Sequence, residues 1–323
     1  MLRIRLVPTK TNIPFMRQRL TAFVLSVALI IASIGLFASK GLNYGIDFEG
    51  GILIEVGSDQ AVDIGKMRSA LGNLGLGEVA LQEFGRDTDV LIRVERQPGD
   101  STAQQVAVDA VKVALAKEIA SKLSYRRVEF VGPKVSGELV EAGTMAMLLA
   151  VAAMLIYIWF RFEWQFSVGA VLALVHDVIL TIGVFSLLGL EFNLSIIAAI
   201  LTIIGYSMND TVVIYDRIRE NLRKYRTLPL KELLDLSVNE TLARTAMTSV
   251  TTLLALITLF FFGGEVIHGF TFAMMWGVVV GTYSSIFVAG PLLLYFGIRR
   301  TDEDAGKDDP SVAKGDSQAI EAD

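Results

Sequence analysis

Six long stretches of the chain carry almost no charge, and polar segments separate them. A membrane-spanning helix needs about 20 consecutive, mostly apolar residues, and each stretch is roughly that long. The stretches are residues 20–39, 142–160, 165–190, 193–215, 244–263 and 268–297. This pattern predicts a polytopic α-helical membrane protein with six transmembrane helices.

The first stretch also has features of a secretory signal peptide, because it follows the basic residues Arg17 and Arg19. The apolar part of a signal peptide, however, has only about 7–15 residues. The sequence Leu36-Phe37-Ala38 at its end also lacks a small-x-small cleavage pattern. We therefore interpret this stretch as a retained membrane anchor.

The polar segment between the first two spans, residues 40–141, is long enough to form a small domain. Its predicted strands are residues 52–56, 79–84, 90–94 and 125–131, and its predicted helices are residues 62–74 and 102–123. The order β-α-β-β-α-β is that of a ferredoxin-like α+β fold. Its charges form no pattern typical of a catalytic or metal site, so we expect a solvated contact or binding module.

Lys and Arg gather in two places, residues 1–19 and residues 216–243. Because basic residues favour the cytoplasmic side, we expect both termini and the 216–243 loop to be cytoplasmic and the 40–141 domain to be external. The leucines of that loop predict either a helix lying on the membrane surface or a hinge between helix pairs. The acidic tail, residues 298–323, has the composition of a disordered segment.

The composition agrees with a membrane protein: 53% of the residues are hydrophobic and 20% are charged, against roughly 45–50% and about 25% in soluble chains. A net charge of −5 gives no electrostatic footprint for nucleic-acid binding. The absence of cysteine excludes disulfides, thiolate metal sites and cysteine nucleophiles.

A few ionisable residues fall inside the predicted spans, where a charge costs at least ~2.5–3.5 kcal/mol. Asp210 is the clearest case, because the apolar run Val212–Tyr215 follows it. At helical spacing, Tyr206 and Ser207 lie on the same face as Asp210. Burial raises the proton affinity of a carboxyl group and a nearby Arg lowers it, so this pattern indicates a reversible proton site.

Two further polar groups leave alternatives open. Arg244 begins the fifth span and precedes hydroxyl residues at helical spacing, the first of which is Thr248. It is either part of an interior polar face or an ordinary cytoplasmic anchor. His176 and Asp177 lie in the third span and are either functional or a polar pair that packs helices. Adjacent side chains point about 100° apart on a helix, so they need not face one cavity.

Four segments together closely resemble the SecF family, the smaller membrane subunits of the bacterial SecD–SecF protein-export accessory complex. They are residues 45–51 (GIDFEGG), 205–221 (GYSMNDTVVIYDRIREN), 244–252 (RTAMTSVTT) and 281–287 (GTYSSIF). The resemblance extends over about residues 17–300. Its six-span layout with one external domain agrees with the topology predicted above.

The resemblance implies half of an RND-like transporter that pairs with SecD in the bacterial inner membrane. It implies association with the SecYEG channel, and with YajC and YidC, and use of the proton-motive force to complete preprotein translocation after the ATP-driven step. It also implies a proton-relay role for Asp210, Arg244 and the neighbouring Asn209. His176, Asp177, Tyr206, Ser207 and Thr248 are expected to support them, and Asp47, Gly50 and Gly51 match a domain-entry motif.

We therefore expect a proton-coupled translocase subunit with no catalytic residues, cofactor or metal of its own. It would contact SecD, the channel, the preprotein and membrane lipid, and no nucleic acid. Two alternatives remain: a transporter half that moves a small solute, and a scaffold that stabilises an export channel without coupling to an ion.

Overall fold

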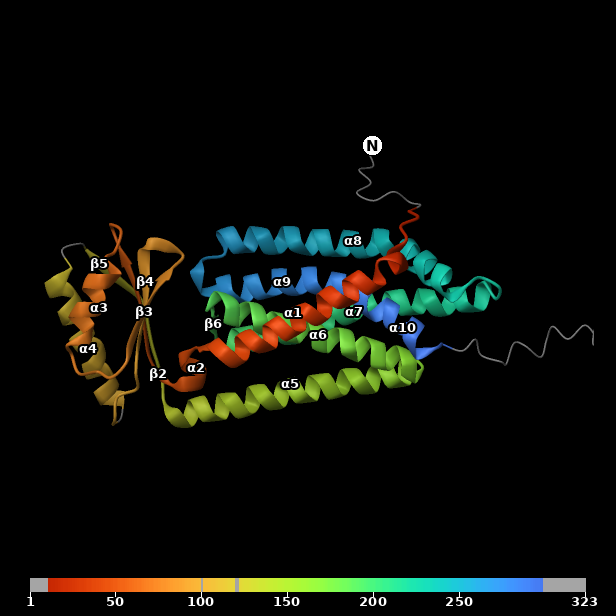
Figure 1. Cartoon of the computed structure of the whole chain (residues 1–323). Helices are drawn as coiled ribbons and strands as arrows, with labels where there is room; N and C mark the ends of the chain where they lie inside the picture. The colour runs from red at the N-terminus through yellow and green to blue at the C-terminus, as the bar shows by residue number, and fades with distance from the viewer. Residues whose placement is uncertain (1–10, 100, 120–121, 299–323) are drawn as a thin grey trace, which may run out of the picture.

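The computed structural model describes residues 11–99, 101–119 and 122–298. A bundle of long helices carries a small sheet domain at one end (Figure 1). Within these ranges, six helical segments are long and apolar enough to cross a membrane, as predicted. They are α1 (Arg19–Lys40), α5 (Pro133–Arg161), α6 (Trp164–Leu188), α7 (Leu194–Lys224), α8 (Leu230–Phe262), and α9 (His268–Ser284) continued by η3 (Ser285–Ala289) and α10 (Gly290–Phe296). The first ten residues and the predicted acidic tail from residue 299 onward lie outside the described residues.

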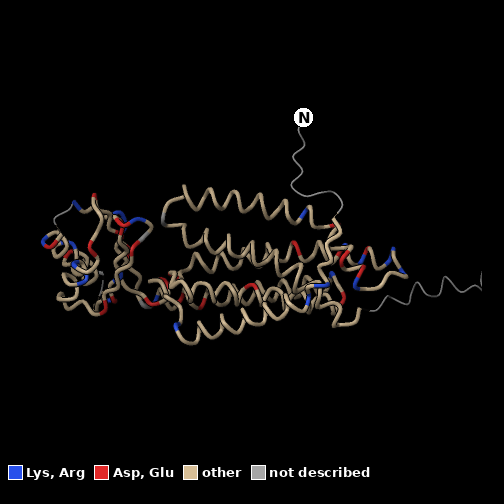
Figure 2. Tube along the Cα trace, turned by 45° about the horizontal axis from the view of Figure 1, so that its top comes forward, with Lys and Arg blue, Asp and Glu red and all other residues tan. Residues whose placement is uncertain are grey.

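Three helices form the interior of the bundle. Half or more of the most apolar window is buried in α6, α7 and the α9–α10 span, but only 6–17% of it in α1, α5 and α8. The charged positions gather in the sheet domain and at the far end of the bundle, with isolated acidic positions between (Figure 2). The outer helices therefore present apolar surface to their surroundings, as lipid-facing helices do.

The segment predicted as a loop at residues 216–243 is mostly helical. The helix α7 continues to Lys224 and α8 begins at Leu230, so only a short turn joins them. Ile218 on α7 and Leu233 and Leu234 on α8 are fully buried. These residues pack the two helix ends into a hairpin, which explains the leucines in the loop. The second spanning helix also begins earlier than predicted, at Pro133 rather than near residue 142.

An N-terminal arm braces this hairpin before the first span begins. The short helix η1 (Phe15–Arg17) precedes α1. The side-chain amide of Asn239 accepts from the Ile13 backbone N–H at 2.9 Å and donates to its carbonyl at 2.9 Å. The backbone N–H of Met16 donates to Asp235 at 2.8 Å, and the Met16 side chain is fully buried.

The sheet domain has the predicted ferredoxin-like order. Its elements are β2 (Gly51–Ser58), α3 (Ile64–Gly72), β3 (Val79–Phe84), β4 (Arg86–Val94), α4 (Ser101–Glu118) and β5 (Leu123–Val131). The strands are antiparallel neighbours in the order β3-β4-β2-β5. Both helices cover one face of the sheet, where Ile52, Ile54, Ile92 and Leu115 are fully buried.

One boundary in this domain differs from the prediction. The long helix was expected to reach residue 123, but α4 ends at Glu118 and Leu123 pairs with Ser58 as the first residue of β5. Leu123 and Tyr125 pack against the domain core at alternate positions, so strand pairing determines this boundary. Near the same edge, Arg126 binds the fully buried Asp89 at 2.9 Å, and this hydrogen bond raises the pKa of Arg126.

Candidate functional site within the bundle

Close contact between α7 and α9 forms the base of the polar site. A Cβ atom on Gly281 would lie only 2.9 Å from that of Ser207, and one on Gly277 would overlap Ile203. The glycines therefore bring the α9 backbone against α7 in a small-xxx-small pattern that is common between membrane helices. As a result, hydroxyl groups on both helices come within reach of α6.

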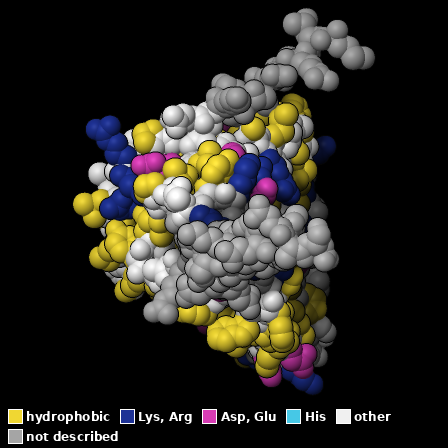
Figure 3. Space-filling model, turned by 90° about the vertical axis from the view of Figure 1, so that its right-hand side faces the viewer, with side chains coloured by type: hydrophobic (Ala, Val, Ile, Leu, Met, Phe, Trp, Pro, Cys, Tyr) yellow, Lys and Arg dark blue, Asp and Glu magenta, His cyan; other side chains and the backbone are white. Residues whose placement is uncertain are grey.

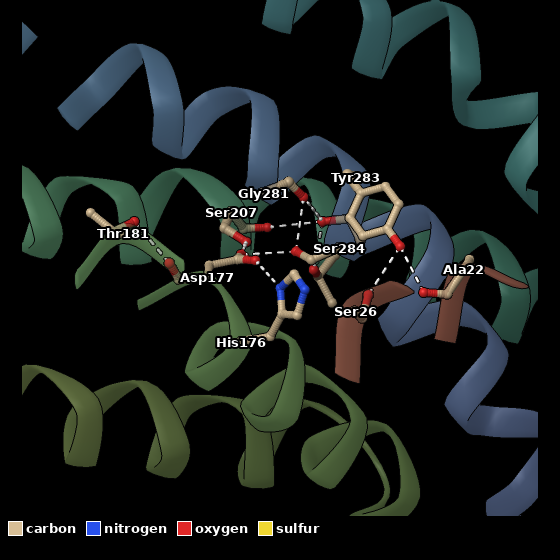
Figure 4. A network of polar contacts seen from close by, with 11 residues as sticks. Ala22, Ser26, His176, Asp177, Thr181, Ser207, Gly281, Tyr283 and Ser284 are labelled. Atoms are coloured by element: carbon tan, nitrogen blue, oxygen red, sulfur yellow. Dashed lines mark hydrogen bonds and ion pairs between the residues drawn. The ribbon is translucent and has the colours of Figure 1, made fainter. Parts of the chain in front are cut away.

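Asp177 on α6 lies at the centre of these hydroxyls (Figure 4). It is 1% exposed. One carboxylate oxygen, Oδ2, accepts from Ser207 on α7 at 2.6 Å and from Ser284 on α9 at 2.8 Å. The other, Oδ1, lies 2.9 Å from Nδ1 of His176. Because a buried carboxylate needs hydrogen-bond donors to offset its desolvation, the two hydroxyl donors explain how an acid is accommodated here.

The same network reaches the outer helix α1. The ring of His176 stacks on Tyr283 with centroids 6.1 Å apart. The Tyr283 hydroxyl donates to the backbone carbonyl of Ala22 at 2.9 Å and lies 3.0 Å from the hydroxyl of Ser26. Four helices thus share one polar network, and His176 and Asp177 both belong to it although adjacent residues need not face one cavity. His176 Nε2 has no hydrogen-bond partner among the described residues.

A second group of hydroxyls continues from this network toward Asp210. Ser285 lies 2.9 Å from Thr211, the residue after Asp210, and also contacts the carbonyls of Gly281 and Ser207 at 2.8 and 3.4 Å. Ser285 begins the π-helical turn η3. Such turns occur often at functional sites, because they shift the register of the following side chains.

Asp210 is 3% exposed, and its Oδ2 atom is buried without a hydrogen-bond partner among the described residues. It lies one turn after Ser207 on α7, as the spacing predicts. The hydroxyl of Tyr206 is buried and unpartnered as well, whereas Asn209 is exposed. Among the described residues of the bundle, Asp210 is therefore a buried acid that lacks the hydrogen-bond donors found at Asp177.

Arg244 lies on the neighbouring helix α8 and is exposed on the surface of the bundle. No ion pair joins it to Asp210 among the residues that the structure describes, but it is near enough for its charge to act on Asp210. The Thr248 hydroxyl donates to carbonyls of its own helix, those of Arg244 and Thr245 at 3.2 and 2.9 Å. We call Thr248, Thr251 and Thr252, which follow Arg244 on α8, the hydroxyl stripe. Thr251 is exposed and the other two are half-buried, so the stripe lies at the outer surface of the bundle.

The domain-entry residues join the sheet domain to the outer end of the bundle. Asp47, in the short helix α2 (Ile46–Glu49), accepts from the Leu194 N–H at 2.9 Å and so caps α7 from outside its own sequence. Gly50 and Gly51 have φ angles of 73° and 115°, and a Cβ on Gly51 would lie 2.7 Å from the carbonyl of Val94. Only glycine fits this turn without strain.

A small parallel strand pair strengthens this junction. The strand β1 (Asn43–Tyr44) pairs with β6 (Glu191–Phe192), which lies between α6 and α7. From the sheet domain, Arg93 binds Glu191 at 3.4 Å and Asn43 at 2.9 Å. The domain is therefore attached directly to the turn that precedes α7.

The acids stand out in the sequence, but most of their partners do not. The sequence pattern assigns no role to four residues of the network, although adjacent hydroxyl residues in an uncharged span are a visible signal; they are Ser26, Tyr283, Ser284 and Ser285. Asp210 is the more prominent acid in the sequence, whereas the larger hydrogen-bond network surrounds Asp177.

Comparisons with known proteins agree with this architecture. Residues 111–299 match the family described as protein export membrane protein SecD/SecF, C-terminal, and residues 35–62 match the SecD/SecF GG motif. The chain belongs to the SecD/SecF family. The motif match includes Gly50 and Gly51, the two glycines of the domain-entry turn.

Proteins named protein translocase subunit SecF are similar over almost their whole length. The one from Rickettsia bellii is 49% identical over 300 residues, which cover 93% of this chain and 98% of the relative. The one from Rhodobacter capsulatus is 49% identical over 321 residues, which cover 96% and 95%. This SecF-family chain is therefore a component of the Sec protein-export machinery, and its place is in a membrane.

Two solved structures share the fold. The crystal structure of SecDF from Thermus thermophilus, a translocon-associated membrane protein, matches with a TM-score of 0.81 and 37% identity over 91% of this chain. SecDF in a super-membrane-facing form matches with a TM-score of 0.64 and 35% identity over 94% of this chain. This chain spans only about 40% of each SecDF chain, and the match supports an association with SecD.

Proposed function

We propose that this SecF-family chain and SecD together couple the proton-motive force to the late steps of preprotein translocation. The two would act in the bacterial inner membrane, with both termini of this chain cytoplasmic, at the SecYEG channel and with YajC and YidC. They would act after the ATP-driven step, and this chain would have no hydrolytic site of its own. The observation that carries the proposal is the buried Asp210, whose Oδ2 has no partner among the described residues, on a helix that packs against the helix of the exposed Arg244.

The exposed polar residues support SecD as the missing half of the site. Arg244 and Asn209 are exposed on α8 and α7, and polar groups at membrane depth normally face protein or a wet cavity. The hydroxyl stripe after Arg244 lies on the same outer surface. A partner bundle covering this surface would convert it into an interior, with Asp210 and Arg244 at the boundary between the two halves.

The chemistry of the proposed step is the gain and loss of a proton at Asp210. When ionised, its free oxygen attracts Arg244; when protonated, the attraction is lost and the helices α7 and α8 are free to separate locally. Each charge that crosses 100 mV supplies ~2.3 kcal/mol. This energy biases a two-state equilibrium roughly 50-fold, since ~1.4 kcal/mol is a factor of ten.

The hydroxyl groups between the two acids suggest how the step spreads through the bundle. Thr211 follows Asp210 and contacts Ser285, which in turn contacts the carbonyl of Ser207, a donor to Asp177. A shift of α7 on protonation therefore changes the hydrogen bonds of α6 and α9. We assign His176 and Asp177 the role of holding this packing rather than of releasing protons.

Pulse-chase export of a secreted protein tests the proposal in cells depleted of this chain. The cells are rescued with the wild type, Asp210→Asn, Arg244→Ala or the control Glu232→Gln, which removes an exposed acid near the start of α8, and membrane levels are checked by blotting. Export is expected to stay slow with the first two variants and to recover with the control.

Proton flux separates the proposal from its alternatives. Flux into vesicles containing this chain and SecD is expected to fall several-fold with Asp210→Asn. Full export and unchanged flux with both variants would overturn the proposal and leave a scaffold role. Export of a small solute that depends on Asp210, with normal protein export, would indicate a solute transporter instead.

A further inference from the structure

At the end of the bundle away from the sheet domain, basic side chains line a pocket between α5 and the extension of α7. Its lining residues are Arg161, Asp216, Arg219, Glu220, Arg223 and Lys224. Four are basic and two acidic, which leaves a formal excess of two positive charges. Figure 3 looks onto this end, where basic and hydrophobic side chains lie next to one another.

Two of the arginines are held in place before any ligand binds. The guanidinium groups of Arg161 and Arg219 lie 4.9 and 5.6 Å from the centre of the buried Phe162 ring. Arg161 uses only Nη2 on Asp216, at 2.6 and 2.8 Å. Arg219 donates through Nη1 to the Arg161 carbonyl at 3.2 Å. Both keep further N–H groups with no partner among the described residues, and planar guanidinium groups suit phosphate oxygens well.

The surroundings place the pocket at the membrane interface rather than in open solvent. Trp159 and Phe160, directly before Arg161, are 68% and 87% exposed, and Tyr157 is 52% exposed. Exposed aromatic residues followed by a basic residue mark the level of the headgroups. Only 6% of the most apolar 18-residue stretch of α5 is buried. This helix therefore offers a long exposed surface for acyl chains, which runs from the pocket toward the sheet domain.

We propose that this pocket binds the phosphate of an anionic phospholipid, with the acyl chains along α5. Basic pockets between membrane helices are suited to such headgroups. The excess of positive charge disfavours a zwitterionic lipid, whose own cation would be repelled. The exposed apolar surface beneath favours a lipid over a free phosphate ion. The proposal does not rest on proton coupling, because the pocket contains neither Asp210 nor Arg244.

Native mass spectrometry of the purified full chain tests the proposal with two variants of equal charge loss. Arg223→Gln/Lys224→Gln removes two basic side chains of the pocket, and Arg226→Gln/Lys231→Gln removes two that lie outside its lining. Phosphatidylglycerol and phosphatidylcholine are offered separately. The pocket variant is expected to retain phosphatidylglycerol about 30-fold less well. Each basic residue near an anionic headgroup contributes ~1 kcal/mol, and ~1.4 kcal/mol is a factor of ten. The control variant is expected to lose less than threefold.

A second measurement detects lipid near the pocket in membranes by tryptophan quenching, and it uses the unsubstituted chain. Brominated phosphatidylglycerol is expected to quench Trp159 and Trp164 fluorescence more than brominated phosphatidylcholine does at equal content. Equal quenching, or equal retention of phosphatidylglycerol by the two variants, would overturn the proposal. Release of the lipid by millimolar inorganic phosphate at constant ionic strength would overturn it too, in favour of a free-anion site.

Discussion

The hydrogen bonds of Asp177 lead to a quantitative prediction about its charge. Ser207 donates to Oδ2 at 2.6 Å, and Ser284 donates to the same atom at 2.8 Å. A hydrogen bond to a charged group contributes about 1.5–3 kcal/mol, whereas hydrogen bonds between neutral side chains in membrane proteins average about 0.6 kcal/mol. The size of the coupling between these residues therefore reports whether the carboxyl group is ionised in the folded bundle.

A double-mutant cycle of Asp177→Asn and Ser207→Ala measures that coupling. Because two hydroxyl groups donate to the same Asp177 oxygen, Oδ2, we expect a coupling free energy of about 1.5–3 kcal/mol. The assay is reversible unfolding in mixed detergent micelles, followed by circular dichroism. A repeat of the cycle with Ser284→Ala in place of Ser207→Ala is expected to give a similar value.

Two outcomes of the cycle would refute this reasoning. A coupling near 0.6 kcal/mol would mean that Asp177 is neutral and its network an ordinary set of polar contacts. A coupling close to zero would mean that the hydroxyls do not bind the carboxyl group at all. Thr202→Ala is a suitable reference variant. Thr202 lies on α7, like Ser207, and its hydroxyl donates to the carbonyl of Ala198 in the same helix.

Two further predictions concern the packing of the bundle and its junction with the sheet domain. Gly281→Ala is expected to destabilise the bundle by about 1–3 kcal/mol, because the new Cβ would press on Ser207. The control is Gly35→Ala, which is expected to be neutral or stabilising because nothing lies within 4 Å of the new Cβ. If neither substitution changed the unfolding midpoint, the close contact between Gly281 and Ser207 would be contradicted. Asp47→Ala is expected to cost about 0.5–2 kcal/mol and to speed hydrogen exchange of the Leu194 amide, and unchanged exchange there would rule out the cap.

The sequence was sufficient for the architecture because burial in lipid and burial in a small domain leave different periodic signals. Charge-free stretches located the spans, and alternation with turn residues located the strands of residues 40–141. The same logic failed at residues 216–243. There, Leu233 and Leu234 pack against the extended α7, and their spacing alone does not distinguish a helix on the membrane from a helix on another helix.

The polar site was predictable only in part, for a different reason. A lone acid such as Asp210 stands out in an apolar span because its cost is high. Its partners do not stand out, since hydroxyl residues are common in membrane helices and bond readily to their own backbone. Which hydroxyls reach Asp177 depends on the close approach of α7 and α9 at Gly281, a tertiary contact that no local pattern encodes.

The cap of Asp47 on the first N–H of α7 has a mechanical consequence. Asp210 lies 16 residues after Leu194 on one uninterrupted helix, a distance of about 24 Å at ~1.5 Å per residue. If α7 pivots near Asp210 by about 5°, its outer end moves by about 2 Å over that length. A hydrogen bond of 2.9 Å does not stretch by that amount. A pivot of α7 would therefore either move the sheet domain together with the helix end or break the hydrogen bond between Asp47 and Leu194.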